Sequence, residues 1–298
     1  MTKITKAVIA AAGFGTRFLP QTKAMPKEML PLIDKPIIQY VVEELVAAGI
    51  KDIIIVGSGN KRSIEDHFDV PSEELLANLR AGGEKKLPLI TEIETVANLA
   101  NFVYIRQKGP YGNATPLACA AHLIGKDEPF IYTFADDFIV ASPSRFSQMI
   151  AAYEKYGGPV LSCKPAVQDD EYDRYGFVAG ETIDPGVIKL SHIVEKPGKA
   201  NAPSNLASVS SYLLTGAFFD YLDKAKDAYD GTGEFVQQPI MQQMINDGTA
   251  FYACEIQNGR YYDTGDKLEY LKTVIDFGLN HEDLGAPLRA YLQEIIGR

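Results

Sequence analysis

Short unbroken runs of apolar residues alternate along this chain with stretches in which apolar residues recur every three or four positions. The unbroken runs are typical of strands that are buried on both faces. In the first half of the chain, four of them are expected as strands, at residues 7–12, 53–56, 102–105 and 130–134. Residues 37–48 have helical spacing instead, and Gly49 is suited to cap that helix. This alternation predicts an open α/β sheet flanked by helices.

The same pattern continues through the rest of the chain. Further strands are expected at 159–163, from 175 to 180, where a second and more twisted set begins, and at 251–256. Helices are expected at 143–156, 218–228 and 235–245, and from 268 to the end. Residues 69–100 are helical in pattern and mixed in charge, which indicates an inserted helical subdomain or an oligomer contact.

Two glycines directly follow the first predicted strand, at positions 13 and 15. Because glycine has no Cβ, such a loop can turn tightly and bring its N–H groups against an anion. Arg17 and Lys27 supply positive charge, the first as a bidentate fork and the second as a point charge. The loop matches neither the Walker pattern nor the three-glycine dinucleotide fingerprint. We therefore expect a phosphate site of another type; a plain glycine-rich turn is the alternative.

Two later strand ends carry residues suited to a nucleotide. Gln107 offers both a donor and an acceptor, as reading a base edge requires, and Gly112 would let a base lie against backbone. Asp136 and Asp137 follow a buried aromatic strand, where adjacent carboxylates are costly without a cation. Mg²⁺ prefers oxygen ligands shared between carboxylate and phosphate. Ligands gather at the carboxyl ends of strands in open sheets, although each motif alone could be a turn or a helix cap.

Glu195 and Lys196 form a further candidate pair, just before Pro197. Adjacent residues point to opposite faces of a strand, so both can reach one ligand only if the strand ends or bulges there. A glutamate suits sugar hydroxyl groups and a lysine suits a sugar phosphate. The alternative is a surface charge pair of little consequence.

Together these segments resemble the sugar-1-phosphate nucleotidyltransferases. The resemblance is carried first by Ala11-Ala12-Gly13-x-Gly15-Thr16-Arg17 and by Pro26-Lys27-x-Met29-Leu30-Pro31. The segments 107–112, 194–197 and 202–207 are similar to those of the bacterial UTP-glucose-1-phosphate uridylyltransferases in particular. The motifs follow the family's order along essentially the whole chain.

The resemblance implies a Rossmann-like, mixed and mostly parallel sheet flanked by helices, with a smaller sugar-binding β region. It also implies one nucleotidyltransferase domain at 1–298. Within this domain, residues 1–140 would bind nucleotide and contain the helical insertion 69–100. Residues 141–267 would bind the sugar, and 268–298 would form C-terminal helices.

The family's functional residues map onto matching positions of this sequence. The resemblance implies catalytic roles for Arg17, Lys27 and Lys196, and Mg²⁺ ligands at Asp136 and Asp263. Nucleotide binding is implied for Ala11, Ala12, Gly13, Gly15, Thr16, Gln107 and Gly112. The sugar phosphate would contact Gly176, Glu195 and Lys196.

The implied reaction joins UTP and glucose 1-phosphate to give UDP-glucose and pyrophosphate. Charge neutralisation and positioning would supply most of the catalysis, because two polyanions must meet. The chain departs from the family at Asn113-Ala114-Thr115 and lacks the family's Thr-Asp pair in 233–240. Because Ala114 is closer to the thymidylyltransferase pattern, a thymidylyltransferase or another sugar specificity is an alternative, and a nucleotide-sugar-binding regulatory protein is a second.

Composition limits the partners further. The 298 residues carry a net charge of −10, which argues against non-specific binding to nucleic acid or anionic membranes. The three cysteines have no metal-binding spacing and are expected as buried thiols in a reducing compartment. No apolar run is long enough to cross a bilayer, and the short one after the basic start passes directly into the glycine loop. A cytoplasmic homo-oligomer is expected.

Overall fold

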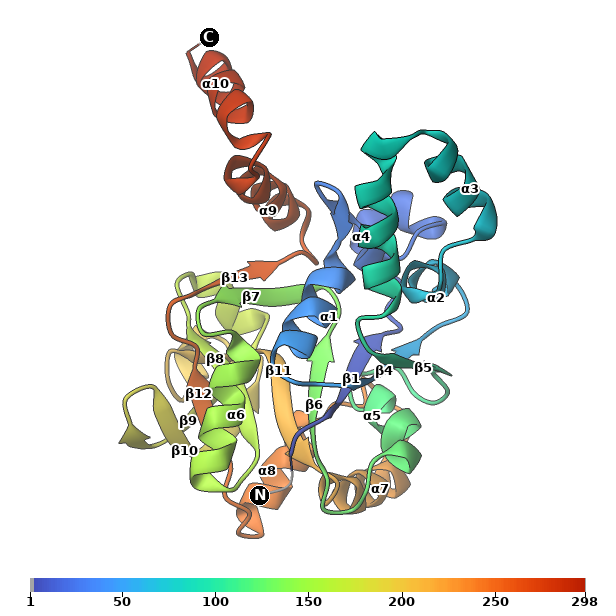
Figure 1. The fold of residues 1–298 in the computed structure, drawn as a ribbon. Helices are drawn as coiled ribbons and strands as arrows, with labels where there is room; N and C mark the ends of the chain where they lie inside the picture. The colour runs from blue at the N-terminus through green and yellow to red at the C-terminus, as the bar shows by residue number, and fades with distance from the viewer. Residues whose placement is uncertain (1–2, 298) are drawn as a thin grey trace.

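A nine-stranded mixed sheet forms the centre of the computed structural model, which describes residues 3–297 (Figure 1). Residues 1, 2 and 298, which the predicted domain includes, lie outside the described residues. In spatial order the strands are β5 (Asn101–Arg106), β4 (Asp52–Gly57), β1 (Lys6–Ala11), β6 (Pro129–Phe134), β11 (Leu206–Thr215), β8 (Val160–Pro165), β12 (Tyr252–Glu255), β10 (Val187–Glu195) and β9 (Gly176–Asp184). Strands β5, β4, β1 and β6 are parallel, and antiparallel pairing begins at β11. The predicted mixed α/β fold is confirmed.

Helices cover both faces of this sheet. One face packs against α1 (Ile37–Ala47), α2 (Arg62–Phe68) and α6 (Arg145–Tyr156). The other packs against α5 (Thr115–Ala120), α7 (Phe218–Ala228) and α8 (Gln238–Asn246). Strand β1 serves both cores, because Ala7 and Ile9 face the first and Val8 faces the second. All three side chains are fully buried, which explains the unbroken apolar run.

The remaining elements lie around the sheet. Residues 69–100 hold α3 (Glu73–Ala81) and α4 (Leu87–Ala97), so helices occupy the predicted insertion. Two small pairs are β2 (Pro31–Leu32) with β3 (Lys35–Pro36), and β7 (Asp137–Ala141) with β13 (Gly259–Asp263). The 3-10 helices are η1 (Thr16–Phe18), η2 (Gln21–Lys23), η3 (Lys27–Met29), η4 (Glu84–Lys86), η5 (Ala121–Leu123), η6 (Asp169–Asp173) and η7 (Lys199–Asn201). The division of the chain into functional halves stays a prediction.

Two C-terminal helices project from the body of the molecule (Figure 1). Helix α9 (Lys267–Asn280) contacts β2 and β13, and α10 (Gly285–Ile296) packs on α9. The continuous helix expected from residue 268 is therefore two helices with a break at 281–284. Several of their apolar side chains are exposed, among them Leu268, Leu271, Ile275, Tyr291 and Ile296.

Two other expectations differ from the structure. The helix expected from Phe235 begins at Gln238, because Phe235 is buried in a loop whose backbone pairs with residues 111 and 114. The cysteines are only partly as expected, since Cys163 and Cys254 are buried but Cys119 is partly exposed.

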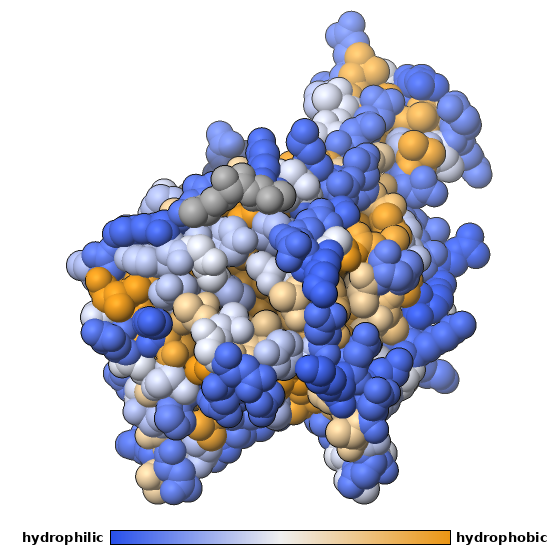
Figure 2. All heavy atoms as spheres, turned by 90° about the horizontal axis from the view of Figure 1, so that it is seen from below, coloured by the Kyte–Doolittle hydropathy of each residue, from blue (hydrophilic) through white to orange (hydrophobic). Residues whose placement is uncertain are grey.

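The surface fits the charged composition. In the view of Figure 2 it is largely hydrophilic, and hydrophobic residues form small separate patches. None of the helices within residues 3–297 combines the length and the apolar character that crossing a membrane requires.

Candidate active site

The glycine loop follows β1 and packs directly on the Lys27 segment. Gly15 has φ +63°, and a Cβ added there would lie 3.1 Å from both Lys27 Cβ and Thr22 Cγ2. Glycine is therefore required at 15 for both conformation and space. At Gly13 an added Cβ would lie 3.6 Å from Lys27 Nζ, so the lysine side chain runs along the loop. The two motifs predicted to share a phosphate are in contact.

A buried ion pair between Lys61 and Glu28 contacts the glycine loop. Lys61 Nζ lies 2.7 Å from Glu28 Oε2 and donates to the Gly13 carbonyl at 2.6 Å. Both side chains are at most 3% exposed. Burial raises the pKa of Glu28, and the charges of Lys61 and Lys27 oppose that shift. Neither Lys61 nor Glu28 was predicted to have a role. Lys61 follows a Gly-Ser-Gly-Asn turn, which alone indicates only a loop.

Lys27 forms an ion pair with Asp136 across the site. Burial lowers the pKa of Lys27, but the negative charges of Asp136 and Glu28 raise it more, so the net shift is upward. The lysine therefore remains a cation throughout the physiological pH range. A fixed positive charge beside the glycine loop is what a phosphate site requires.

Asp136 and Asp263 lie close together near Gly265, although 127 positions separate them in the sequence. Strand β7 pairs with β13 so that Asp137 lies opposite Asp263. An added Cβ at Gly265 would lie 3.2 Å from Asp263 Oδ1, 3.3 Å from Asp136 Oδ2 and 3.4 Å from Arg17 Nη1. Arg17 also donates to the Gly265 carbonyl at 3.2 Å. Two carboxylates and a guanidinium thus converge beside the glycine loop.

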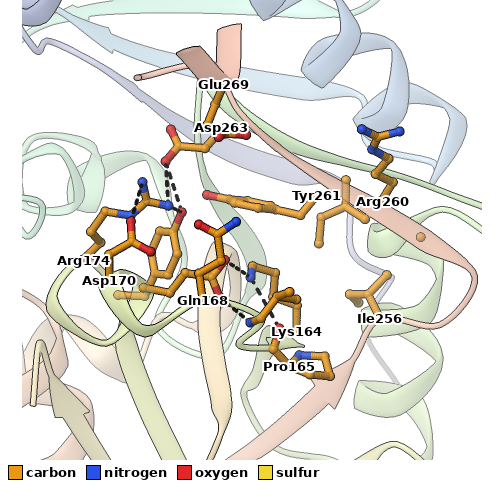
Figure 3. A pocket seen from close by; sticks show the side chains of 15 residues that line it. Lys164, Pro165, Gln168, Asp170, Arg174, Ile256, Arg260, Tyr261, Asp263 and Glu269 are labelled. Atoms are coloured by element: carbon orange, nitrogen blue, oxygen red, sulfur yellow. Dashed lines mark hydrogen bonds and ion pairs between the residues drawn. The ribbon is translucent and has the colours of Figure 1, made fainter. Parts of the chain in front are cut away.

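Neighbouring side chains fix the orientation of Asp263, as Figure 3 shows. The Tyr175 hydroxyl donates to Asp263 Oδ2 at 3.1 Å, and Arg174 Nη2 lies 3.8 Å from the same oxygen. Arg174 also donates to the Tyr175 hydroxyl at 2.9 Å. These partners contact Oδ2, and Oδ1 accepts a hydrogen bond from the Gly265 N–H at 3.0 Å. The cavity drawn in Figure 3 measures about 420 Å³ and lies on the Oδ2 side.

Asp137 does not act as an exposed helix cap or a solvated turn. It begins strand β7, which was not predicted from the sequence, and its Oδ2 accepts a hydrogen bond from Tyr261 at 3.1 Å. Burial, followed by the charge of Asp136, raises the pKa of Asp137 to about 7. Its Oδ1 is buried without a hydrogen-bond partner among the described residues.

A cavity of about 400 Å³ opens between the glycine loop and the end of β6. Of the predicted nucleotide-binding residues, it is lined by Ala12, Gly13, Gln107 and Gly112, together with Lys27 and Asp136. We call it the glycine-loop cavity. Three predicted residues do not line it: Ala11 ends β1 and is buried, Gly15 supports the loop, and Thr16 is exposed in η1.

The predicted sugar-binding residues also meet. Gly176 pairs with Glu195 across β9 and β10, and an added Cβ at Gly176 would lie 3.0 Å from Glu195 Oε2. Strand β10 ends at Glu195, and Lys196 has φ +47°, so the alternation of faces is broken at this pair. Glu195 Oε2 is buried without a hydrogen-bond partner among the described residues, and burial raises the pKa of Glu195. Lys196 is half exposed, with Nζ 3.8 Å from Glu195 Oε1.

The two segments that depart from the family pattern contact each other. The Asn113 side chain accepts from the Gln237 N–H at 2.9 Å and donates to Gln238 Oε1 at 3.4 Å. Phe235 donates its N–H to the Tyr111 carbonyl at 2.8 Å. The backbone passes so close here that a Cβ at Gly112 would lie 2.1 Å from the Phe235 carbonyl oxygen. The loop at 111–114 and the loop before α8 therefore form one unit.

A Rossmann-like sheet with a glycine loop, a lysine and paired carboxylates at its strand ends defines a nucleotide-transferring class of protein. The family described as "Nucleotidyl transferase" matches residues 6–277, and the chain belongs to it. The chain is 40% identical to a UTP--glucose-1-phosphate uridylyltransferase of Bacillus subtilis (strain 168), covering 100% of this chain and 99% of that protein. A Staphylococcus epidermidis protein of the same name is 39% identical over 99% of both.

Solved structures agree with these relatives. The UTP-bound UGPase from Acinetobacter baumannii superposes with a TM-score of 0.86 at 34% identity, covering 98% of this chain and 99% of that one. A UDP-glucose pyrophosphorylase complexed with UDP-glucose gives a TM-score of 0.82 at 33% identity, covering 94% and 100%. A thymidylyltransferase structure from Bacillus anthracis, described there as putative, matches at 19% identity with a TM-score of 0.69 and shares the fold alone.

Proposed function

We propose that this chain transfers a uridylyl group from UTP to glucose 1-phosphate, giving UDP-glucose and pyrophosphate. The main support is the convergence of Arg17, Lys27, Asp136 and Asp263 from separate loops, with Lys27 and Asp136 lining the glycine-loop cavity. The relatives at about 40% identity carry the name of this activity, and the similar solved structures include UTP and UDP-glucose complexes.

In this proposal the glycine-loop cavity holds UTP. The backbone N–H groups around Gly13 face the phosphates, and Lys27 and Arg17 neutralise their charge. Gln107 hydrogen-bonds the uracil edge, and Gly112 lets the ring approach the backbone. An oxygen of glucose 1-phosphate then attacks the α-phosphorus in line, and pyrophosphate leaves. The attacking oxygen is already anionic, so the step requires neither a side-chain nucleophile nor a general base.

The sugar phosphate would lie at the end of β10. Glu195 Oε2 is buried and has no partner among the described residues, so a sugar hydroxyl would supply the missing donor. Lys196, placed beside it by the left-handed backbone, would hold the phosphate. These positions let one ligand reach both side chains at the strand end.

Mg²⁺ is the proposed cofactor, with Asp136 and Asp263 as its protein ligands. The donor set fits, because Mg²⁺ is commonly held by one or two carboxylates together with substrate phosphates. No group of three or more His, Cys, Asp or Glu side chains that could hold a metal occurs within residues 3–297, so the substrate would complete the coordination. When bound, the ion neutralises phosphate charge. The chain's part is to orient Asp263 through Tyr175 and Arg174.

The same proposal extends to assembly and location. The exposed apolar side chains of α9 and α10, such as Leu271 and Tyr291, support a homo-oligomer formed through the projecting helices. Sedimentation of a monomer at micromolar concentration would overturn this. UTP as substrate and three free cysteines support a cytoplasmic location.

A nucleotide panel tests the proposed activity. Pyrophosphate release would be measured with glucose 1-phosphate and UTP, dTTP, GTP, CTP or ATP in turn. We expect UTP to give the highest kcat/KM. A preference for dTTP would identify a thymidylyltransferase, and binding of UDP-glucose without turnover would favour the regulatory alternative.

Lys27→Ala tests the phosphate site within the same assay. Removal of the cation beside the glycine loop is expected to lower turnover at least about a thousandfold, because several kcal/mol of charge stabilisation is lost. Lys23→Ala, an exposed lysine on η2, is the matched control and should retain activity. Ordinary turnover by the folded Lys27 variant would contradict its assignment.

A further inference from the structure

A second large cavity lies on the opposite side of the loop that lines the glycine-loop cavity. It measures about 720 Å³ and lies beside β5, α5 and α7, which are neighbours in Figure 1. Its lining comes from the end of β5, the loop at 108–110, helix α5, His122 of η5, Lys226 of α7, and Phe235. We call it the β5–α5 cavity. The proposed reaction uses none of its side chains.

The charged side chains in this lining are all positive. Arg106, Lys108 and Lys226 are cations and His122 is titratable, whereas none of the described residues that line the cavity is Asp or Glu. Arg106 pairs with Glu65 at 3.0 Å, but Lys108 and Lys226 form no ion pair with the described residues. In a chain of net charge −10, uncompensated cations gathered at one cavity favour an anion.

Most of the remaining lining is apolar. Tyr104, Ile105, Pro110, Ala118 and Phe235 contribute rings and aliphatic surface between the cations. A cavity of this volume lies in the range used for small ligands, which combine apolar burial with a few polar contacts. Inorganic phosphate alone would leave the apolar surface uncovered. The lining therefore fits a phosphate ester that carries an aromatic or apolar group.

The cavity shares a wall with the nucleotide site. Gly109 lines both cavities. Its φ is +129°, and a Cβ added there would lie 3.1 Å from Thr115 Cγ2. Thr115 donates to the Pro110 carbonyl at 2.6 Å, and Phe235 donates to the Tyr111 carbonyl. A ligand that moves Phe235 or Pro110 therefore moves the loop that carries Gly112.

We propose that the β5–α5 cavity binds a phosphate ester with an aromatic or apolar group, and that its occupancy changes the affinity of the glycine-loop cavity for nucleotide. The second part rests on the proposed function. The first part does not, because it concerns binding to the chain without nucleotide.

Calorimetric titration of the whole chain with phenyl phosphate tests the site. Phenyl phosphate is expected to bind at least about tenfold more tightly than inorganic phosphate or benzoate. Lys226→Glu should weaken it at least about tenfold, whereas Lys224→Glu, on the same helix but facing another cavity, should change it less than about threefold. Lys108→Glu is the second variant. Thermal unfolding checks that each variant is folded.

Binding at the nucleotide site instead would be recognised by Lys27→Ala. If that variant loses phenyl phosphate while Lys226→Glu retains it, or if Lys226→Glu and Lys224→Glu bind equally, the site is refuted. For the coupling, phenyl phosphate should change the UTP dissociation constant by about fivefold or more, and UTP should change the affinity for phenyl phosphate by the same factor. An unchanged UTP constant with the cavity occupied would refute the coupling alone.

Discussion

Lys61→Met tests how the glycine loop is held. At 2.7 Å between Nζ and the Glu28 carboxylate, and with an effective dielectric constant near 20, the pair attracts by about 6 kcal/mol before desolvation is subtracted. Methionine keeps the length of the side chain but leaves a buried carboxylate without its partner. Such removals cost about 3–5 kcal/mol of unfolding free energy.

The variant should also acquire a steeper pH dependence. Burial already raises the pKa of Glu28, and without Lys61 that pKa rises further. The folded variant then holds a proton that the unfolded chain releases above the ordinary glutamate pKa. Stability is therefore fully present at low pH and falls by up to about 1.4 kcal/mol per pH unit until the pH passes the folded pKa.

Urea unfolding at about pH 6 and about pH 8 measures both effects. Arg62→Met is the matched control, because the neighbouring Arg62–Asp66 pair is exposed and should contribute less than about 1 kcal/mol. Glu28→Gln combined with Lys61→Met removes both charges and should abolish the added slope. If Lys61→Met unfolds like Arg62→Met and with the wild-type slope, the buried pair does not support the loop.

Four further substitutions test the metal ligands and the loop unit. Mn²⁺ can replace Mg²⁺ as a probe, because its binding is measured by electron paramagnetic resonance. Asp136→Asn and Asp263→Asn should each weaken Mn²⁺ binding, and normal binding in both variants would refute their assignment as metal ligands. Tyr175→Phe removes the donor to Asp263 Oδ2 and should lower metal affinity about 10–100-fold with little change in unfolding free energy. Gly112→Ala should destabilise the fold far more than Gly49→Ala, since the new Cβ meets Phe235 backbone at 112 and open space at 49; equal unfolding midpoints would contradict this.

The sequence predicted the strand-end residues because their signals are local. A glycine loop after a strand, carboxylates after an aromatic strand and Pro197 after Glu195-Lys196 each depend on a few adjacent residues. The structure brings the glycine loop close to the two carboxylates and, separately, pairs Glu195 with Gly176. The break in alternation at Lys196 is the strand end that the Glu195-Lys196 pair requires. Their roles in binding and catalysis remain proposals.

The features that were missed depend on contacts between distant segments. Lys61 matters because Glu28, 33 positions away, lies beneath the same loop. Strand β7 forms because β13, more than a hundred positions later, pairs with it. The sequence Asp136-Asp137 alone is typical of a turn. Helix α8 begins three residues later than predicted because Phe235 is engaged by the loop at 111–114. Periodicity within one segment contains none of this information.

The same contacts change how Ala114 is interpreted. Ala114 resembles the thymidylyltransferase pattern, and for that reason the sequence alone leaves both uracil and thymine as candidate bases. In the structure Ala114 is fully buried in the core beside α5, donates its N–H to the Phe235 carbonyl at 3.0 Å and does not line the glycine-loop cavity. A small residue at 114 is explained by its full burial in this core at the start of α5, so it does not argue for thymine over uracil. Gln107 and Gly112 do line the cavity and remain the proposed contacts of the base.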